Sequence, residues 1–135
     1  MLRCQPGHAA LTVLIAAALP GTAFAADAPS VFEACMNGAQ STPEYTECSR
    51  VEIARQDKIL NDVWRHVSEK MKAFDTRAFD SLLNEQRKWI QWKESACQYY
   101  QNGFGSEGKS LRYPMCFIGI LRDRITHLSA LADEL

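Results

Sequence analysis

Two groups of residues in this sequence could do chemistry or hold a fold together. The first is a set of four cysteines: Cys35, Cys48, Cys97 and Cys116. The second is a set of polar residues that fall within otherwise apolar, helix-spaced stripes: Asp57, Asn61, Gln86, Lys93 and Arg124. Paired cysteines predict disulfides, and polar residues at core positions of helices predict a polar layer between those helices.

This polar layer has two interpretations. In the first, the charged heads lie at the edge of the stripe, where Lys93 and Arg124 cover apolar surface with their stems and reach water. In the second, the five side chains form a paired, hydrogen-bonded network that fixes the register of the helices, because an unpaired buried charge is costly. Either interpretation gives the layer a structural role.

A catalytic or metal site is not indicated. His66 and His127 have no cysteine or histidine at a metal-ligand spacing. The sequence contains no Cys-x-x-Cys for redox chemistry and no Gly-x-Ser-x-Gly for a serine nucleophile. The acidic residues mostly fall on exposed helix faces, which disfavours a paired-carboxylate glycosidase. We therefore expect no enzyme activity, no cofactor and no metal.

The first 25 residues have the three regions of a secretory signal peptide. Arg3 provides a positive charge, residues 9–19 are apolar except for Thr12, and Ala23-Phe24-Ala25 is a cleavage site. We predict that residues 1–25 are removed and that residues 26–135 form one domain in the periplasm or outside a bacterial cell. Disulfides persist there. The apolar run is too short for a membrane span.

Charge also limits the partners of the mature chain. The whole chain has a formal net charge of −1, and the leader holds one basic and no acidic residue, so the mature chain is at −2. A near-neutral balance of this kind does not favour a nucleic acid or a membrane surface as the partner.

Helical spacing of apolar residues predicts an all-α fold. Capping residues and proline mark the helix starts at Thr42-Pro43, Asp75-Thr76 and Tyr113-Pro114. The expected helices cover residues 42–72, 75–101 and 113 to near the C-terminus. Residues 34–41 are expected to form a turn-bearing segment, and residues 102–112, with three glycines, a loop. The fold is then a small, disulfide-stapled antiparallel bundle of three main helices with a short N-terminal segment.

A short link between the first two helices makes them antiparallel, so residues whose numbers sum to about 150 lie at one level. Asp57 is then expected to face Lys93, and Asn61 to face Trp89. If the third helix is antiparallel to the second, Arg124 lies near Trp89 as well.

The chain has five cysteines, and the predicted removal of the leader takes Cys4 with it; the remaining four allow three disulfide arrangements. We predict the pairs Cys35 with Cys48 and Cys97 with Cys116, because each pair brackets one loop and both pairs lie toward the same end of the bundle.

The order of these motifs resembles the LprI-type lysozyme-inhibitor-like family of exported bacterial proteins, for most of which no role is established. The resemblance covers nearly all of the mature chain. Its parts are a first cysteine pair at Cys35 and Cys48, Asp57-Lys-Ile-Leu60-Asn61, Gln86-x-x-Trp89 followed by Cys97, Gly105-Ser106, and Cys116 with Arg124 eight residues later. Two positions depart from the family pattern. Lys93 replaces an expected arginine, which removes the planar fork of a bidentate pair, and Trp64 replaces a frequent tyrosine.

The resemblance implies a non-catalytic binding protein that protects the cell wall by inhibiting a lysozyme. The alternative is a cell-envelope interaction or stability module that binds another envelope protein and inhibits nothing. Contacts are expected from the 102–112 loop and its aromatic flank, because loops on a rigid scaffold commonly carry binding residues. The candidate partner-binding residues are Tyr99, Tyr100, Phe104, Ser106, Lys109 and Arg112. A connector without a partner is the other interpretation of this loop.

Overall fold

The computed structural model describes residues 30–135, and every regular element in this range is a helix. The elements are α1 (Val31–Gly38), α2 (Thr42–Phe74), α3 (Thr76–Ala96), α4 (Gln98–Gly103), α5 (Gly105–Glu107), the π-helix η1 (Gly108–Arg112) and α6 (Tyr113–Glu134). The predicted all-α class is confirmed. The predicted signal peptide and its cleavage site lie outside the described residues.

The first helix replaces the turn that we expected over residues 34–41, so that prediction was wrong. The Ser30 side chain accepts a hydrogen bond from the backbone N–H of Glu33, and the Glu33 carboxylate accepts one from the backbone N–H of Ser30. This reciprocal pair is a capping box, which satisfies two N–H groups that a helix start leaves unpaired. The Asn37-Gly38 pair, from which the turn was inferred, lies at the end of α1.

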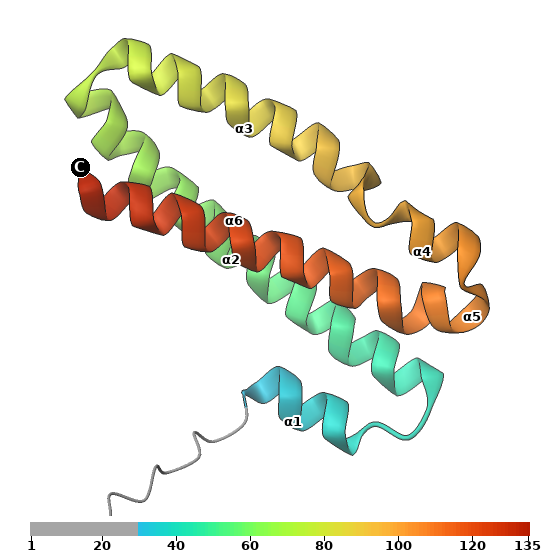
Figure 1. The fold of residues 1–135 in the computed structure, drawn as a ribbon. Helices are drawn as coiled ribbons and strands as arrows, with labels where there is room; N and C mark the ends of the chain where they lie inside the picture. The colour runs from blue at the N-terminus through green and yellow to red at the C-terminus, as the bar shows by residue number, and fades with distance from the viewer. Residues whose placement is uncertain (1–29) are drawn as a thin grey trace, which may run out of the picture.

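The two predicted helix starts that surround α2 are confirmed. At its N-terminus, Pro43 lies in the first turn, and Glu44 accepts hydrogen bonds from the backbone N–H groups of Gln40 and Ser41. At its C-terminus, Asp75 alone separates α2 from α3, and its Oδ1 accepts hydrogen bonds from the backbone of the first α3 turn. A one-residue link turns the chain back, so α2 and α3 form an antiparallel pair (Figure 1).

The long helices α2 and α6 lie side by side and run in the same direction, and they form the main core (Figure 1). Val67, Leu121 and Leu128 are fully buried between them, with Leu60 and Met71 beside them. Lys70 of α2 donates a hydrogen bond to the carbonyl oxygen of Ala132 near the end of α6. The negative end of the α6 helix dipole also stabilises a cation at this position.

A smaller core cluster attaches α1 to this pair. Phe32 of α1, Cys48 of α2 and Ile118 of α6 are buried together. The Cys35–Cys48 disulfide then links α1 to α2 with a Cα–Cα distance of 5.8 Å.

The chain between α3 and α6 is helical, which corrects two predictions. The second helix ends at Ala96 rather than near Gln101, and residues 102–112, apart from Phe104, lie in α4, α5 and η1 instead of an irregular loop. We call residues 98–112 the end cap, because they close the bundle opposite the α2–α3 turn (Figure 1). Among the described residues, no helix has the length and apolar character needed to cross a membrane.

Candidate functional site

The interior polar layer forms around Arg124, as the antiparallel register predicts. Its guanidinium is almost fully buried and donates from Nε to Gln86 Oε1 at 2.8 Å and from Nη1 to Glu85 Oε1 at 2.7 Å. The same group lies 5.5 Å from the ring centroid of Trp89. The predicted approach of Arg124 to Trp89 is therefore present, and the network interpretation holds for Arg124 and Gln86.

Lys93 and Asp57 also approach each other, but they form a looser pair at the edge of the layer. Lys93 Nζ lies 4.0 Å from Asp57 Oδ1 and 3.7 Å from Glu94 Oε1. The Lys93 side chain is 14% exposed, whereas Asp57 is 44% exposed. The Lys93 Nζ also lies 5.2 Å from the ring centroid of Phe117 and 5.8 Å from that of Trp89, so the ammonium group packs over two aromatic rings.

Asn61 does not take part in this layer. Its side chain is exposed on the outer face of α2. The register argument placed Asn61 at the level of Trp89 but did not fix the direction in which its side chain points. The five predicted residues thus divide into a buried pair, an edge pair and an exposed residue.

A second buried charge cluster was not predicted from the sequence. Glu52 of α2 is 3% exposed and accepts hydrogen bonds from Arg55, Gln56 and Arg122, the last of which reaches across from α6 at 2.7 Å. The hydrogen bonds from Arg55, and then those from Gln56 and Arg122, lower the pKa of Glu52 to about 2 against the opposing effect of burial. The available signal was that Glu52, Gln56 and Leu60 repeat at four-residue steps and so share one helix face.

Both predicted disulfides are present, and the second holds the base of the end cap. Cys97 precedes α4 and bonds to Cys116 in the first turns of α6, with a Cα–Cα distance of 6.0 Å. The connecting segment thus leaves and returns to the bundle at one covalently fixed point.

The aromatic residues of the end cap form a continuous surface. The Tyr99 and Tyr100 ring centroids are 4.2 Å apart, and those of Tyr100 and Phe104 are 5.2 Å apart. Tyr99 is 54% exposed and Phe104 is 49% exposed. Exposed aromatic rings held by a rigid support are typical of the anchor residues at protein interfaces.

The polar candidates lie on the same end cap. Arg112 forms a salt bridge with Glu107 at 2.9 Å and also lies 5.6 Å from the Phe104 ring. Lys109 is exposed, and within residues 30–135 it makes no ion pair. Ser106 is exposed, and its carbonyl accepts a hydrogen bond from the Ser110 hydroxyl. The end cap therefore offers aromatic area and one unpaired cation, but no activated nucleophile.

The glycines of the end cap serve its packing. Gly105 has a positive φ of 59°, which L side chains rarely adopt. At Gly108, an added Cβ would lie 2.2 Å from the Tyr100 carbonyl oxygen and 2.6 Å from the Phe104 Cβ.

Gly103, Gly105 and Gly108 also have the spacing of a dinucleotide-binding motif. That motif requires a preceding strand, whereas these glycines follow helix α3.

Metal binding has no support among residues 30–135. No group of three or more histidine, cysteine, aspartate or glutamate side chains is placed there to hold an ion.

These features define a class of protein, namely a small, disulfide-bonded, all-α protein. The chain belongs to the LprI family, whose sequence model carries the description "Lysozyme inhibitor LprI" and matches residues 35–128. The matched range includes both disulfides, the end cap and Arg124, and it confirms the resemblance found in the motifs. No curated protein and no solved structure matches the chain.

Proposed function

We propose that this protein is an exported, non-catalytic inhibitor of a lysozyme. The observation that carries this proposal is membership of the LprI family over residues 35–128. In this account residues 1–25 are a removed leader, and residues 26–135 act in the periplasm or outside the cell. Two disulfides fit an oxidising compartment of this kind.

The end cap is the surface that we assign to the lysozyme contact. Tyr99 and Phe104 provide exposed aromatic area, and the Cys97–Cys116 disulfide holds that area in place before a partner arrives. A preformed surface loses less conformational entropy on binding than a mobile loop does. Lys109 adds a cation that is complementary to the carboxylates of a lysozyme active site.

The two remaining polar candidates have smaller roles in this proposal. Arg112 contacts Glu107 and the Phe104 ring, so its main role is to hold the surface in place and not to contact the partner. Ser106 lies beside Gly105 at the exposed turn, where its hydroxyl is available to a partner.

Titration of the exported protein into a lysozyme turbidity assay tests the proposal. With both disulfides intact, the protein should slow the clearing of a cell-wall suspension in a dose-dependent and saturable manner. The same protein, reduced and alkylated, is the control for non-specific effects and should inhibit much less. Incubation of the protein alone with peptidoglycan should give no clearing, and clearing would contradict the non-catalytic assignment.

The alternative function is a cell-envelope interaction or stability module. The near-neutral charge of the chain favours it, because such a charge gives little electrostatic steering toward a strongly cationic lysozyme. Failure of the intact protein to inhibit several types of lysozyme would support this alternative and overturn the inhibitor proposal.

A further inference from the structure

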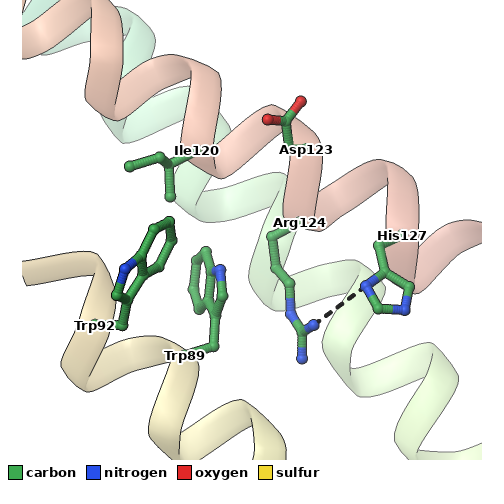
Figure 2. A pocket seen from close by; sticks show the side chains of 6 residues that line it. All are labelled: Trp89, Trp92, Ile120, Asp123, Arg124 and His127. Carbon is green, nitrogen blue, oxygen red and sulfur yellow. Dashed lines mark hydrogen bonds between the residues drawn. The ribbon is translucent and has the colours of Figure 1, made fainter. Parts of the chain in front are cut away.

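A pocket between α3 and α6 has the composition of a small-ligand site. It has a volume of about 210 Å³ and is lined by Trp89, Trp92, Ile120, Asp123, Arg124 and His127. The two tryptophan side chains point from α3 toward α6, and Arg124 extends from α6 toward α3 beside Trp89 (Figure 2). A cavity of about 150 Å³ already admits benzene, so this pocket has room for one six-membered ring with substituents.

The apolar walls of the pocket include the Trp92 ring, which is not buried in the core. Trp89 is partly buried and packs against the main core cluster, where it also lies next to the Arg124 guanidinium. Trp92 is 53% exposed, although it is one of the largest apolar side chains in the protein. An exposed indole in a concave site is available to stack on a ligand.

The polar atoms of the pocket offer both donors and acceptors. Arg124 uses Nε and Nη1 for Gln86 and Glu85, but its buried Nη2 has no hydrogen-bond partner within the described part of the chain. The His127 ring lies 3.4 Å from Arg124 Nη1, and Asp123 is exposed at the rim. A buried donor without a partner is costly, so an oxygen atom that reached Nη2 through a small movement of the side chains covering it would be favourable.

The charges around the pocket disfavour an ionic ligand. The charge of Arg124 is already offset by its salt bridge with Glu85, and Asp123 is exposed to water, which screens its charge, so neither an anion nor a cation gains much attraction on entry. A neutral ring with several hydroxyl groups loses less solvation on entry than an ion does. One face of a sugar ring consists of C–H groups, whose weakly positive hydrogens are attracted to the negative face of an indole.

We propose that the α3–α6 pocket binds one neutral sugar ring, stacked on Trp92 and hydrogen-bonded by Arg124 and His127. This site is separate from the end cap, and it does not depend on lysozyme inhibition. For an exported protein, the neutral rings of cell-envelope saccharides are the ligands of this chemical class.

A set of sugars that share one ring and differ in charge tests this inference. The exported protein, labelled with nitrogen-15, is titrated with N-acetylglucosamine, glucose, glucosamine and glucuronate while the indole N–H signals of its three tryptophans are followed by NMR. The neutral sugars should shift the Trp92 signal saturably, with dissociation constants of the order of millimolar. Glucosamine and glucuronate should bind several-fold more weakly.

Two substitutions provide the matched controls for this titration. Trp92→Ala should weaken binding of the neutral sugars at least about tenfold, because it removes the stacking surface. Ile90 lies on the same helix outside the pocket and is comparably exposed. Ile90→Ala should therefore leave sugar binding unchanged. Equal binding by wild type and Trp92→Ala, tighter binding of glucuronate than of the neutral sugars, or no shift with any sugar would overturn the inference.

Discussion

At the scale of single residues, two buried charges connect the helices, and each has several polar partners. Glu52 receives hydrogen bonds from its own helix and from Arg122 of α6, and Arg124 connects α6 to Glu85 and Gln86 of α3. A buried charge is tolerated when it has charged or hydrogen-bonding partners and is destabilising when it loses them. Both clusters therefore fix how α6 sits against its neighbours.

The Glu52 cluster predicts a specific loss of stability in acid. The pKa of Glu52 is about 2 in the folded protein, below its ordinary value of 4.5, so the ionised form is favoured by folding. The resulting stabilisation is fully present above about pH 5 and is lost as the pH falls toward 2. Because Arg55 and Arg122 are half-exposed, water weakens their attraction to Glu52, and we expect this stabilisation to be about 2 kcal/mol.

Chemical unfolding at a series of pH values measures this contribution. Between about pH 5 and pH 2, the wild type should lose about 2 kcal/mol more than Glu52→Gln, which cannot titrate at this position. Glu47→Gln is the matched control, since Glu47 pairs with Arg50 on the exposed face of the same helix. A pH dependence of Glu52→Gln that equals the wild-type curve would contradict the assignment.

The exposure of Asp57 predicts a small effect of its removal. Asp57→Ala should cost less than about 1 kcal/mol in unfolding free energy, because the pair with Lys93 is long and half open to water and Glu94 remains nearby. Gln86→Ala should cost more, about 2 kcal/mol, because it leaves the buried Arg124 Nε without its acceptor. Urea titrations of the two variants decide the order, and a larger loss for Asp57→Ala would contradict it.

The residues of the polar layer could be predicted only in part, for a physical reason. Spacing and register correctly brought Arg124 to Trp89 and Lys93 to Asp57. Burial depends on the direction in which each side chain leaves its helix relative to the neighbouring helices. The register argument fixes only the level of a residue along the bundle and not this direction. Asn61 was consequently placed in the layer although it is exposed, and Glu52 was overlooked although it is buried.

At the scale of elements, capping chemistry predicts helix starts well because it is local. The starts at Thr42, Thr76 and Tyr113 agree with the structure, since proline or a capping side chain is read directly from neighbouring residues. The Ser30-x-x-Glu33 capping box is equally local, but the turn was predicted from the Asn37-Gly38 pair alone. That choice accounts for the missed helix α1.

The end cap was mispredicted because its helices depend on contacts that are distant in sequence. The Cys97–Cys116 disulfide joins residues 19 apart in sequence and ties these short helices to α6, whereas local glycine content favours a loop. Gly108 is present for close backbone approach and not for flexibility. A glycine is compatible with either explanation when only the sequence is known.

Substitution of Gly108 tests this explanation. Gly108→Ala should lower the unfolding free energy by about 1 to 3 kcal/mol, because its Cβ would overlap the Tyr100 carbonyl oxygen and force the backbone to move. Gly119→Ala is the matched control within α6, where nothing lies within 4 Å of an added Cβ. It should stabilise the protein by about 0.5 to 1 kcal/mol, so thermal denaturation should show shifts of opposite sign. Equal shifts would contradict the packing role of Gly108.

At the scale of the whole molecule, the two disulfides close loops of similar length but hold different parts of the bundle. The sequence separations are 13 for Cys35–Cys48 and 19 for Cys97–Cys116, so loop entropy predicts a stabilisation of about 3 kcal/mol for each. Only the second disulfide anchors the end cap to both α3 and α6.

Replacing each disulfide with serine pairs separates these roles. Cys97→Ser with Cys116→Ser should increase hydrogen exchange of the end-cap amides strongly, whereas Cys35→Ser with Cys48→Ser should increase it mainly in α1. The two variants should lose similar amounts of stability, about 3 kcal/mol each, in denaturant titrations. Unchanged exchange in the end cap of the first variant would show that the aromatic contacts alone hold it.

The central claim is that the end cap carries lysozyme inhibition, and one pair of substitutions tests it most directly. Phe104→Ala removes a half-exposed ring from the end cap but keeps the Cβ that packs against Gly108. Phe74→Ala removes a 71% exposed ring from the α2–α3 turn at the opposite end of the bundle, so the chemical change is the same (Figure 1).

The measurement is the inhibition constant of each variant against a lysozyme that the wild type inhibits. Circular dichroism spectra check that both variants are folded. Phe104→Ala should weaken inhibition at least about tenfold, as expected for loss of an aromatic anchor, while Phe74→Ala should inhibit like the wild type. Equal inhibition by a folded Phe104→Ala variant and the wild type, or a loss confined to Phe74→Ala, would contradict the assignment of the binding surface to the end cap.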